Sequence, residues 1–191
     1  MCHRFLSSPR FFLFLLAIDR DLAEKARSEG CSCGGTLHAA NYPRKPRGGP
    51  PCPDPEFSLR LSFCCDVDGC RCRCTPPSVR FLGRKVYLGV VVLLITAMRQ
   101  GPTPKGYAEL RDRFGADRRT IARWQAWWKK TFPATRFWKV AKARFARLPS
   151  PAKFPQTLIL LFRAESGERM AALLRFLSPL GGSRQFELQE I

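Results

Sequence analysis

The chain has 191 residues, of which 33 are Lys or Arg and 15 are Asp or Glu, so its formal net charge is +18. This length excludes a large catalytic barrel and permits one or two small domains, and a 12% aromatic content excludes a disordered basic tail. A folded protein with this charge is expected to bind a polyanion, either a nucleic acid or an anionic membrane surface.

Residues 1–30 predict an N-terminal amphipathic helix. Apolar side chains recur there at helical spacing, at Leu15, Ile18, Leu22 and Ala26. The apolar run 11–18 follows two arginines, which is also the order of a signal peptide, so a membrane-targeted or secreted Cys-rich protein is one alternative. No small-x-small cleavage site follows this run, and the charged segment 19–27 continues the helical pattern. We therefore expect a helix that packs against the rest of the protein.

Residues 31–84 predict a zinc-ribbon module. Two groups of cysteines lie on either side of the segment 43–55, a predicted loop rich in Pro and Gly. Tetrahedral zinc needs four soft ligands at about 2.3 Å, and each close pair of cysteines can supply two of them. Glycines beside these cysteines would allow the backbone to turn sharply around the metal. The predicted ligands of a structural Zn²⁺ are Cys31, Cys33, Cys65 and Cys70.

The spacing of the cysteines leaves alternative ligands open. The first pair is C-x-C, shorter than the usual gap in zinc sites, and the second group offers five cysteines for two positions. Cys64, Cys72 and Cys74 are therefore alternates, and His38 could replace one thiolate. A disulfide-bonded or reactive cluster is the alternative to zinc. Residues 57–63 alternate between apolar and polar side chains, which predicts a strand leading into Cys64.

Residues 85–147 predict a helix-turn-helix domain with a basic extension. A transmembrane helix needs about 20 apolar residues, and the apolar run 86–98 is shorter than this. The run therefore predicts a buried core helix. A second helix is predicted from Thr103 to Phe114, followed by Gly115 in the turn. Asp117 then caps a third helix that extends to Lys130. Two helices joined by a short turn, with a third packed on them, form a helix-turn-helix unit.

The third predicted helix carries a basic surface beside an apolar one. Ile121, Trp124 and Trp128 share one face at helical spacing, so they are expected to be core residues. Residues 101–150 hold 13 basic and 3 acidic side chains, and residues 118–130 contain no acid. Arg and Gln side chains on an exposed helix suit the major groove of DNA. The predicted nucleic-acid contacts are Arg118, Arg119, Arg123, Gln125, Lys129, Lys130, Arg136 and Lys139.

The remaining residues, 148–191, are nearly neutral and predict a segment for packing or partner contact, with a helix over 168–177. The sequence contains no Gly-rich phosphate loop followed by Lys and Ser or Thr, and its two histidines leave no Ser/His/Asp set. Its carboxylates show no pattern that would gather catalytic metal ions. We therefore expect a protein that is not an enzyme.

Several motifs together resemble a known class of protein. They are the run from Cys31 to His38, the segment 41–48, and the cysteines from Cys64 to Cys70. The chain resembles small bacterial zinc-ribbon proteins, and over about residues 20–147 it is similar to the zinc-ribbon plus helix-turn-helix modules of insertion-sequence transposases and their accessory proteins. The resemblance implies a mainly α fold with a small β zinc ribbon and a trihelical helix-turn-helix domain. It also implies that Arg119 and Arg123 read DNA.

The resulting hypothesis is a cytoplasmic, nucleoid-associated protein that binds double-stranded DNA beside a structural zinc ribbon. It would act in transposition or in transcription regulation, without a catalytic site of its own. The expected partners are DNA and either a separate transposase or a second copy of the chain, with no small-molecule substrate and no membrane. The alternatives are an RNA- or ribosome-associated zinc-ribbon protein, because basic ribbons also bind RNA, and the membrane-targeted protein described above.

Overall fold

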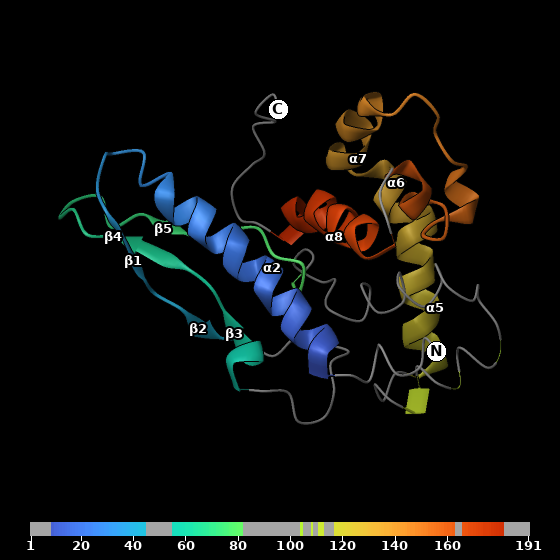
Figure 1. Ribbon diagram of the computed structural model, residues 1–191, viewed down its shortest axis with the longest axis horizontal. Helices are drawn as coiled ribbons and strands as arrows, with labels where there is room; N and C mark the ends of the chain where they lie inside the picture. Colours follow the sequence, from blue (N-terminus) through green and yellow to red (C-terminus); the bar gives the residue numbers. More distant parts are fainter. Residues whose placement is uncertain are drawn as a thin grey trace.

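The fold combines helices with two small antiparallel sheets, as a computed structural model of the chain shows (Figure 1). This agrees with the expectation of mainly α structure and a small β part. The structure describes residues 9–44, 55–81, 104, 108, 111–112, 117–162 and 166–181.

Parts of the predicted helix-turn-helix domain lie outside the described residues. These parts include the whole apolar run 86–98 and most of the predicted helix 103–114, in which only residues 104, 108, 111 and 112 are described, all of them helical. Most of the Pro- and Gly-rich segment 43–55 lies outside as well. The trihelical arrangement therefore stays a prediction.

The predicted N-terminal helix is confirmed as α2, which spans Pro9–Ser28. Phe11, Leu15 and Ile18 are fully or almost fully buried on one side of it. Leu22 is half-buried one turn further along, so the apolar stripe does pack against the protein. Among the described residues, no helix has both the length and the apolar character needed to span a bilayer.

The cysteine region forms two antiparallel sheets. One sheet has the strand order β1 (Leu37–Ala39), β4 (Phe63–Cys65), β5 (Arg73–Cys74), and the other pairs β2 (Tyr42–Pro43) with β3 (Leu59–Arg60). In the first sheet Leu37 lies opposite Cys65 and Ala39 lies opposite Phe63. Because side chains alternate along a strand, Leu37, Phe63 and Cys65 are buried on one side of the sheet.

The predicted strand over 57–63 is only partly correct. A 3₁₀ turn spans Pro55–Ser58, and the strand that follows is divided into β3 and β4. The break lies at Ser62, whose backbone N–H donates to the side-chain oxygen of Asn41 at 3.0 Å. Ser62 Oγ is also 3.3 Å from the carbonyl oxygen of Cys74. The alternating pattern therefore predicted extended chain correctly. It did not predict the hydrogen bond from Ser62 to Asn41, at which the strand is interrupted.

The predicted cap of the following helix is confirmed. Asp117 accepts a hydrogen bond from the backbone N–H of Thr120, and α5 spans Arg118–Ala126. The helix continues through a π-helical turn, Trp127–Thr131, into α6, Phe132–Ala134. Thr135 then caps α7, Arg136–Ala141, by accepting from the N–H of Trp138 at 3.2 Å.

The C-terminal part of the described chain contains several short 3₁₀ turns and one longer helix. The predicted helix 168–177 is confirmed within α8, Ser166–Leu177. The 3₁₀ turns span Lys142–Arg144, Pro151–Lys153, Leu158–Leu161 and Ser178–Gly181.

Helix α2 belongs to two hydrophobic cores. Its N-terminal half packs in a large core with side chains of α5–α8. In this core the ring centroids of Trp128 and Trp138 each lie 5.1 Å from that of Phe132. Its C-terminal half packs through Ala23 and Ala26 in a smaller core with the cysteine sheet. The helix thus joins the helical part to the sheet (Figure 1), and it ends at Ser28, three residues before Cys31.

Candidate metal centre

The first cysteine pair lies in a tight turn that follows α2. The backbone N–H of Cys31 donates to the carbonyl of Gly35 at 3.1 Å, and Gly34 N–H donates back to the carbonyl of Cys31 at 2.8 Å. Gly34 has a φ of +85°, which glycine adopts without strain. Gly35 has no room for a side chain, since a Cβ there would lie 2.6 Å from Sγ of Cys65. This turn therefore requires its two glycines for different reasons.

The second pair lies on the turn between β4 and β5. Cys65 is the last residue of β4, and its N–H donates to the carbonyl of Cys72 at 3.0 Å. The N–H of Cys70 donates to the carbonyl of Val67 at 3.1 Å, and Gly69 has a φ of +87°. The chain thus folds back within a few residues and directs both thiols toward the end of α2.

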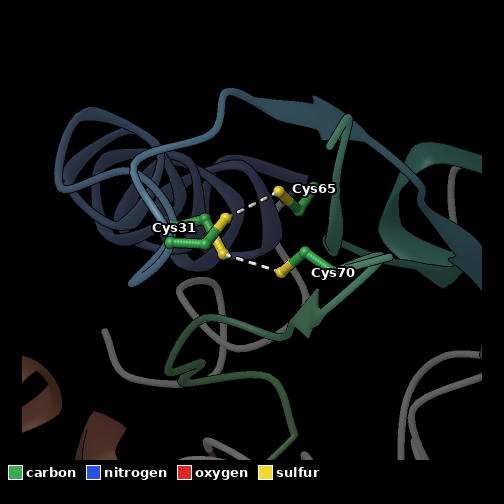
Figure 2. A group of neighbouring side chains, drawn as sticks. Cys31, Cys65 and Cys70 are labelled. Atoms are coloured by element: carbon green, nitrogen blue, oxygen red, sulfur yellow. Dashed lines mark hydrogen bonds between the residues drawn. The ribbon is translucent and has the colours of Figure 1, made fainter. Parts of the chain in front are cut away.

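The four predicted ligand residues lie together in space. The sulfur atoms of Cys31, Cys33, Cys65 and Cys70 are all within 4.8 Å of one another. Sγ of Cys31 is 3.7 Å from that of Cys70, and Sγ of Cys33 is 3.4 Å from that of Cys65. Figure 2 shows the two pairs facing each other, one from the turn after α2 and the other from the β4–β5 turn.

This spacing fits a tetrahedral metal ion. Four zinc–sulfur bonds of about 2.3 Å place the sulfurs roughly 3.8 Å apart, which lies within the observed range of separations. Cys31 and Cys65 are buried, while Cys33 is exposed. The geometry is therefore compatible with a metal ion held by these four side chains.

The pKa values of the thiols differ strongly without a bound cation. A hydrogen bond from the backbone of Cys33, with help from its thiol, lowers the pKa of Cys31 to about 6. A backbone hydrogen bond from Val67 favours the thiolate of Cys65, yet burial and the thiols around it together raise its pKa to about 12. The pKa of Cys70 is raised as well, despite a backbone hydrogen bond from Cys72. A second negative charge is thus unfavourable here unless a cation compensates it.

The alternative ligands lie outside this group. His38 is exposed on β1, with Nε2 3.4 Å from Oδ2 of Asp66. Cys64 is next to Cys65 on β4, so its side chain projects from the opposite side of the sheet. Cys74 is buried in the smaller core and Cys72 is exposed to solvent. The pairing of β1 with β4 therefore selects Cys65 over Cys64, a choice that the spacing alone left open.

The predicted nucleic-acid contacts lie along α5, the π-helical turn and α7. Gln125 is half-buried, and the cations are all exposed, namely Arg118, Arg119, Arg123, Lys129, Lys130, Arg136 and Lys139. Arg123 Nη2 donates to Thr120 Oγ1 at 2.8 Å. In the part of the chain that the structure describes, none of these cations pairs with a carboxylate. Moreover, residues 118–162 contain no acidic side chain at all. These residues thus form a continuous positively charged segment.

A buried ionic cluster was missed by the sequence reasoning. Asp19, in the middle of α2, accepts from Nε of Arg80 at 2.6 Å, and both side chains have no exposed surface. Asp19 also accepts from Ser78 Oγ at 2.6 Å and from the N–H of Val79 at 2.7 Å. One signal could have found it, because Asp19 follows Leu15 by four residues and so lies on the buried face of the helix.

Comparison with known proteins found no matching family model, no matching curated protein and no matching solved structure. The resemblance to zinc-ribbon and helix-turn-helix modules therefore stays an expectation.

Proposed function

We propose that this protein binds one structural Zn²⁺ ion through Cys31, Cys33, Cys65 and Cys70. The observation that carries the proposal is the mutual approach of these four sulfur atoms to within 4.8 Å. Four thiolates are soft ligands that favour zinc over magnesium or calcium. Four protein ligands leave no open position for a substrate, so the ion would stabilise the fold and would not catalyse a reaction.

The hydrophobic core around these cysteines is small, which explains why a bound metal would be needed to stabilise this part of the fold. Among the described residues, six buried residues pack together there, and three of them are cysteines. A core of this size contributes little stability, and small modules of this kind commonly depend on a metal or disulfides. Zinc would join the end of α2 to the β4–β5 turn and hold both in place.

Metal analysis of single variants tests the site. Protein purified without chelator should contain one zinc per chain, Cys33→Ser should lose most of it, and Cys72→Ser should retain it. Cys72 is the matched control, because it is an exposed thiol outside the group of four. A well-folded, zinc-free wild-type protein, with or without disulfides between the two pairs, would refute the proposal.

We also propose that α5 and α7 bind double-stranded DNA, as part of a transposase-associated or regulatory protein. The supporting observation is the row of exposed cations on an acid-free segment. Arg119 and Arg123 lie one turn apart on α5 and can approach base edges together, while Lys139 on α7 lies further along and suits a phosphate contact. Because Gln125 is half-buried, we assign base reading to the arginines rather than to this residue.

An anisotropy titration over a salt series tests the nucleic-acid proposal. The logarithm of the association constant for duplex DNA should fall linearly with the logarithm of the salt concentration. The slope should be about −0.9 for each phosphate contact. Arg119→Ala with Arg123→Ala should weaken binding at least tenfold. The control, Lys25→Ala with Arg27→Ala, removes the same charge from the exposed face of α2 and should have little effect. Affinity independent of salt, equal losses in both double variants, or stronger binding to structured RNA would contradict the proposal for DNA.

A further inference from the structure

Buried arginine side chains gather around the ring of Phe81. Arg60 is 1% exposed and Arg80 is 0% exposed, and Phe81 itself is 1% exposed. The guanidinium carbons of Arg60 and Arg80 lie 5.6 and 5.4 Å from the centroid of the Phe81 ring. The guanidinium of Arg44, which is half-buried, lies 5.5 Å from the same centroid. Two buried guanidinium groups and one half-buried guanidinium group thus lie around a single aromatic ring.

Arg80 has a counterion and most of its hydrogen bonds. Its Nε donates to Asp19, and its Nη1 donates to the carbonyl oxygen of Phe57 at 2.8 Å and to that of Glu56 at 3.3 Å. Its Nη2 is buried and finds no acceptor in the part of the chain that the structure describes. One donor of Arg80 is therefore left over.

Arg60 has hydrogen bonds, but among the described residues no carboxylate forms an ion pair with it. Its Nη2 donates to the carbonyl oxygens of Pro76 and Gly181, the latter at 2.8 Å. Its Nε and Nη1 are buried and have no acceptor among the described residues. Carbonyl groups satisfy part of its hydrogen-bonding capacity, but they carry no net charge.

The charges of the described residues in this region do not balance. The carboxylate of Asp19 already accepts from Arg80, Ser78 and Val79, so it neutralises Arg80. Burial lowers the pKa of Arg60 to about 10, with Asp19 acting in the opposite direction, so Arg60 remains charged at neutral pH. An uncompensated buried charge is costly, and buried donors in native proteins are normally satisfied. Water would satisfy the donors but would leave the charge.

We propose that the buried guanidinium of Arg60, with the remaining donor of Arg80, binds a small oxyanion of the phosphate or sulfate class. Such an anion supplies both the missing negative charge and several acceptor oxygens, and arginine is the side chain best suited to it. The site is separate from the cysteine cluster and from the exposed cations of α5 and α7.

The enclosure of Arg60 selects a free anion over a nucleic-acid phosphate. Gly181 packs so closely on the 78–81 segment that a Cβ at this position would lie 2.6 Å from the carbonyl oxygen of Phe81. With 1% of Arg60 exposed, a polymer backbone cannot reach its guanidinium. The anion would therefore be enclosed during folding and retained by the folded protein.

Anion retention and thermal stability together test the site. Zinc-loaded protein is desalted into chloride buffer and then denatured, and the released phosphate and sulfate are measured by ion chromatography. In parallel, the melting temperature is compared in phosphate and chloride at equal ionic strength. We expect about one retained anion per chain, and a melting temperature about 5–10 °C higher at a phosphate concentration 100 times its dissociation constant.

Two variants separate this site from general attraction to a basic surface. Arg60→Gln should lose both the retained anion and the phosphate effect, whereas Lys25→Gln, which removes one exposed charge from α2, should keep both. A phosphate effect that persists in Arg60→Gln would overturn the proposal, since the surface would then be its source. No retained anion and equal melting temperatures in wild type would overturn it as well. If Arg60→Gln does not fold, the wild-type measurement decides alone.

Discussion

The carboxylate of Asp19 and the guanidinium of Arg80 form an ion pair with Oδ2 and Nε 2.6 Å apart, and both side chains are fully buried. This pair links the middle of α2 to the segment that follows the cysteine sheet. Since α2 contributes to both hydrophobic cores, the ion pair lies where the two cores meet the same helix. Its integrity should therefore matter for the whole fold.

Removing the charge of Asp19 should destabilise the protein strongly. Asp19→Asn leaves Arg80 buried without a counterion, which typically costs about 3–5 kcal/mol of the free energy of unfolding. Asp21→Asn is a matched control on the same helix, because Asp21 pairs with Arg175 at 2.8 Å but is 62% exposed. That exposed pair should contribute less than about 1 kcal/mol. Urea unfolding of the zinc-loaded proteins measures both values.

If Asp19→Asn and Asp21→Asn lowered the free energy of unfolding by the same small amount, the role assigned to the buried pair would be contradicted. A double replacement, Asp19→Leu with Arg80→Met, removes both charges together. It should destabilise the protein less than Asp19→Asn alone, because no uncompensated charge is left inside.

Gly35 should be essential for the geometry of the cysteine cluster. In Gly35→Ala the added methyl group would lie 2.6 Å from both Sγ of Cys65 and a side-chain carbon of Val67, so the two turns must move apart. Displacing groups that position metal ligands typically costs 10–100-fold in affinity, and we expect a loss of about this size. Competition with a chromophoric zinc chelator measures it. Ser32→Ala, at an exposed position between two of the ligands, should leave the affinity unchanged.

Zinc should protect specific thiols from alkylation. Metal-bound thiolates react slowly with iodoacetamide, whereas exposed free thiols are accessible to it. Peptide mapping of the zinc-loaded protein should show modification of Cys72 and protection of the four clustered cysteines. Removing zinc with a chelator should expose Cys31 and Cys33 first, since the first has a pKa of about 6 and the second is exposed. Rapid modification of Cys33 in the zinc-loaded protein would argue against its role as a ligand.

Proton release on zinc binding should depend on pH in a defined direction. At pH 7.5 the thiol of Cys65, with a pKa of about 12, is protonated in the metal-free protein, while Cys31, with a pKa of about 6, is already ionised. Below pH 6 Cys31 is also protonated, so zinc must displace about one more proton. Binding therefore weakens, and the stability that zinc adds is lost, as the pH falls.

Isothermal titration in buffers of different ionisation enthalpy counts these protons. We expect about 0.7 additional proton released at pH 5.5 relative to pH 7.5, because a thiol with a pKa of about 6 is only partly protonated at pH 5.5. Equal proton release at both values would show that Cys31 does not ionise ahead of the other thiols.

Local features of the fold were predictable where a single short segment determines them. The helical spacing in α2 and the cap of α5 at Asp117 depend on neighbouring residues, and both predictions are confirmed. The choice of Cys65 over Cys64 depends on the register of β4 against β1, which spacing along the chain does not specify. The hydrogen bond from Ser62 to Asn41, which divides the predicted strand, joins residues distant in sequence.

The partners of the buried charges were not predictable for the same physical reason. The spacing from Leu15 places Asp19 on the buried face of α2, but its ion pair depends on a partner in the segment 78–81. Likewise, Arg60 alternates with apolar neighbours as an exposed strand residue would, yet it is enclosed through contacts with Pro76 and Gly181. Only the folded chain brings such groups together.

The structural zinc site is tested most directly by X-ray absorption spectroscopy at the zinc edge, on full-length protein purified without chelator. We predict one zinc per chain, surrounded by four sulfur atoms at about 2.3 Å and by no nitrogen or oxygen ligand. A folded protein without zinc, or a zinc ion with nitrogen or oxygen in its first coordination sphere, would contradict it.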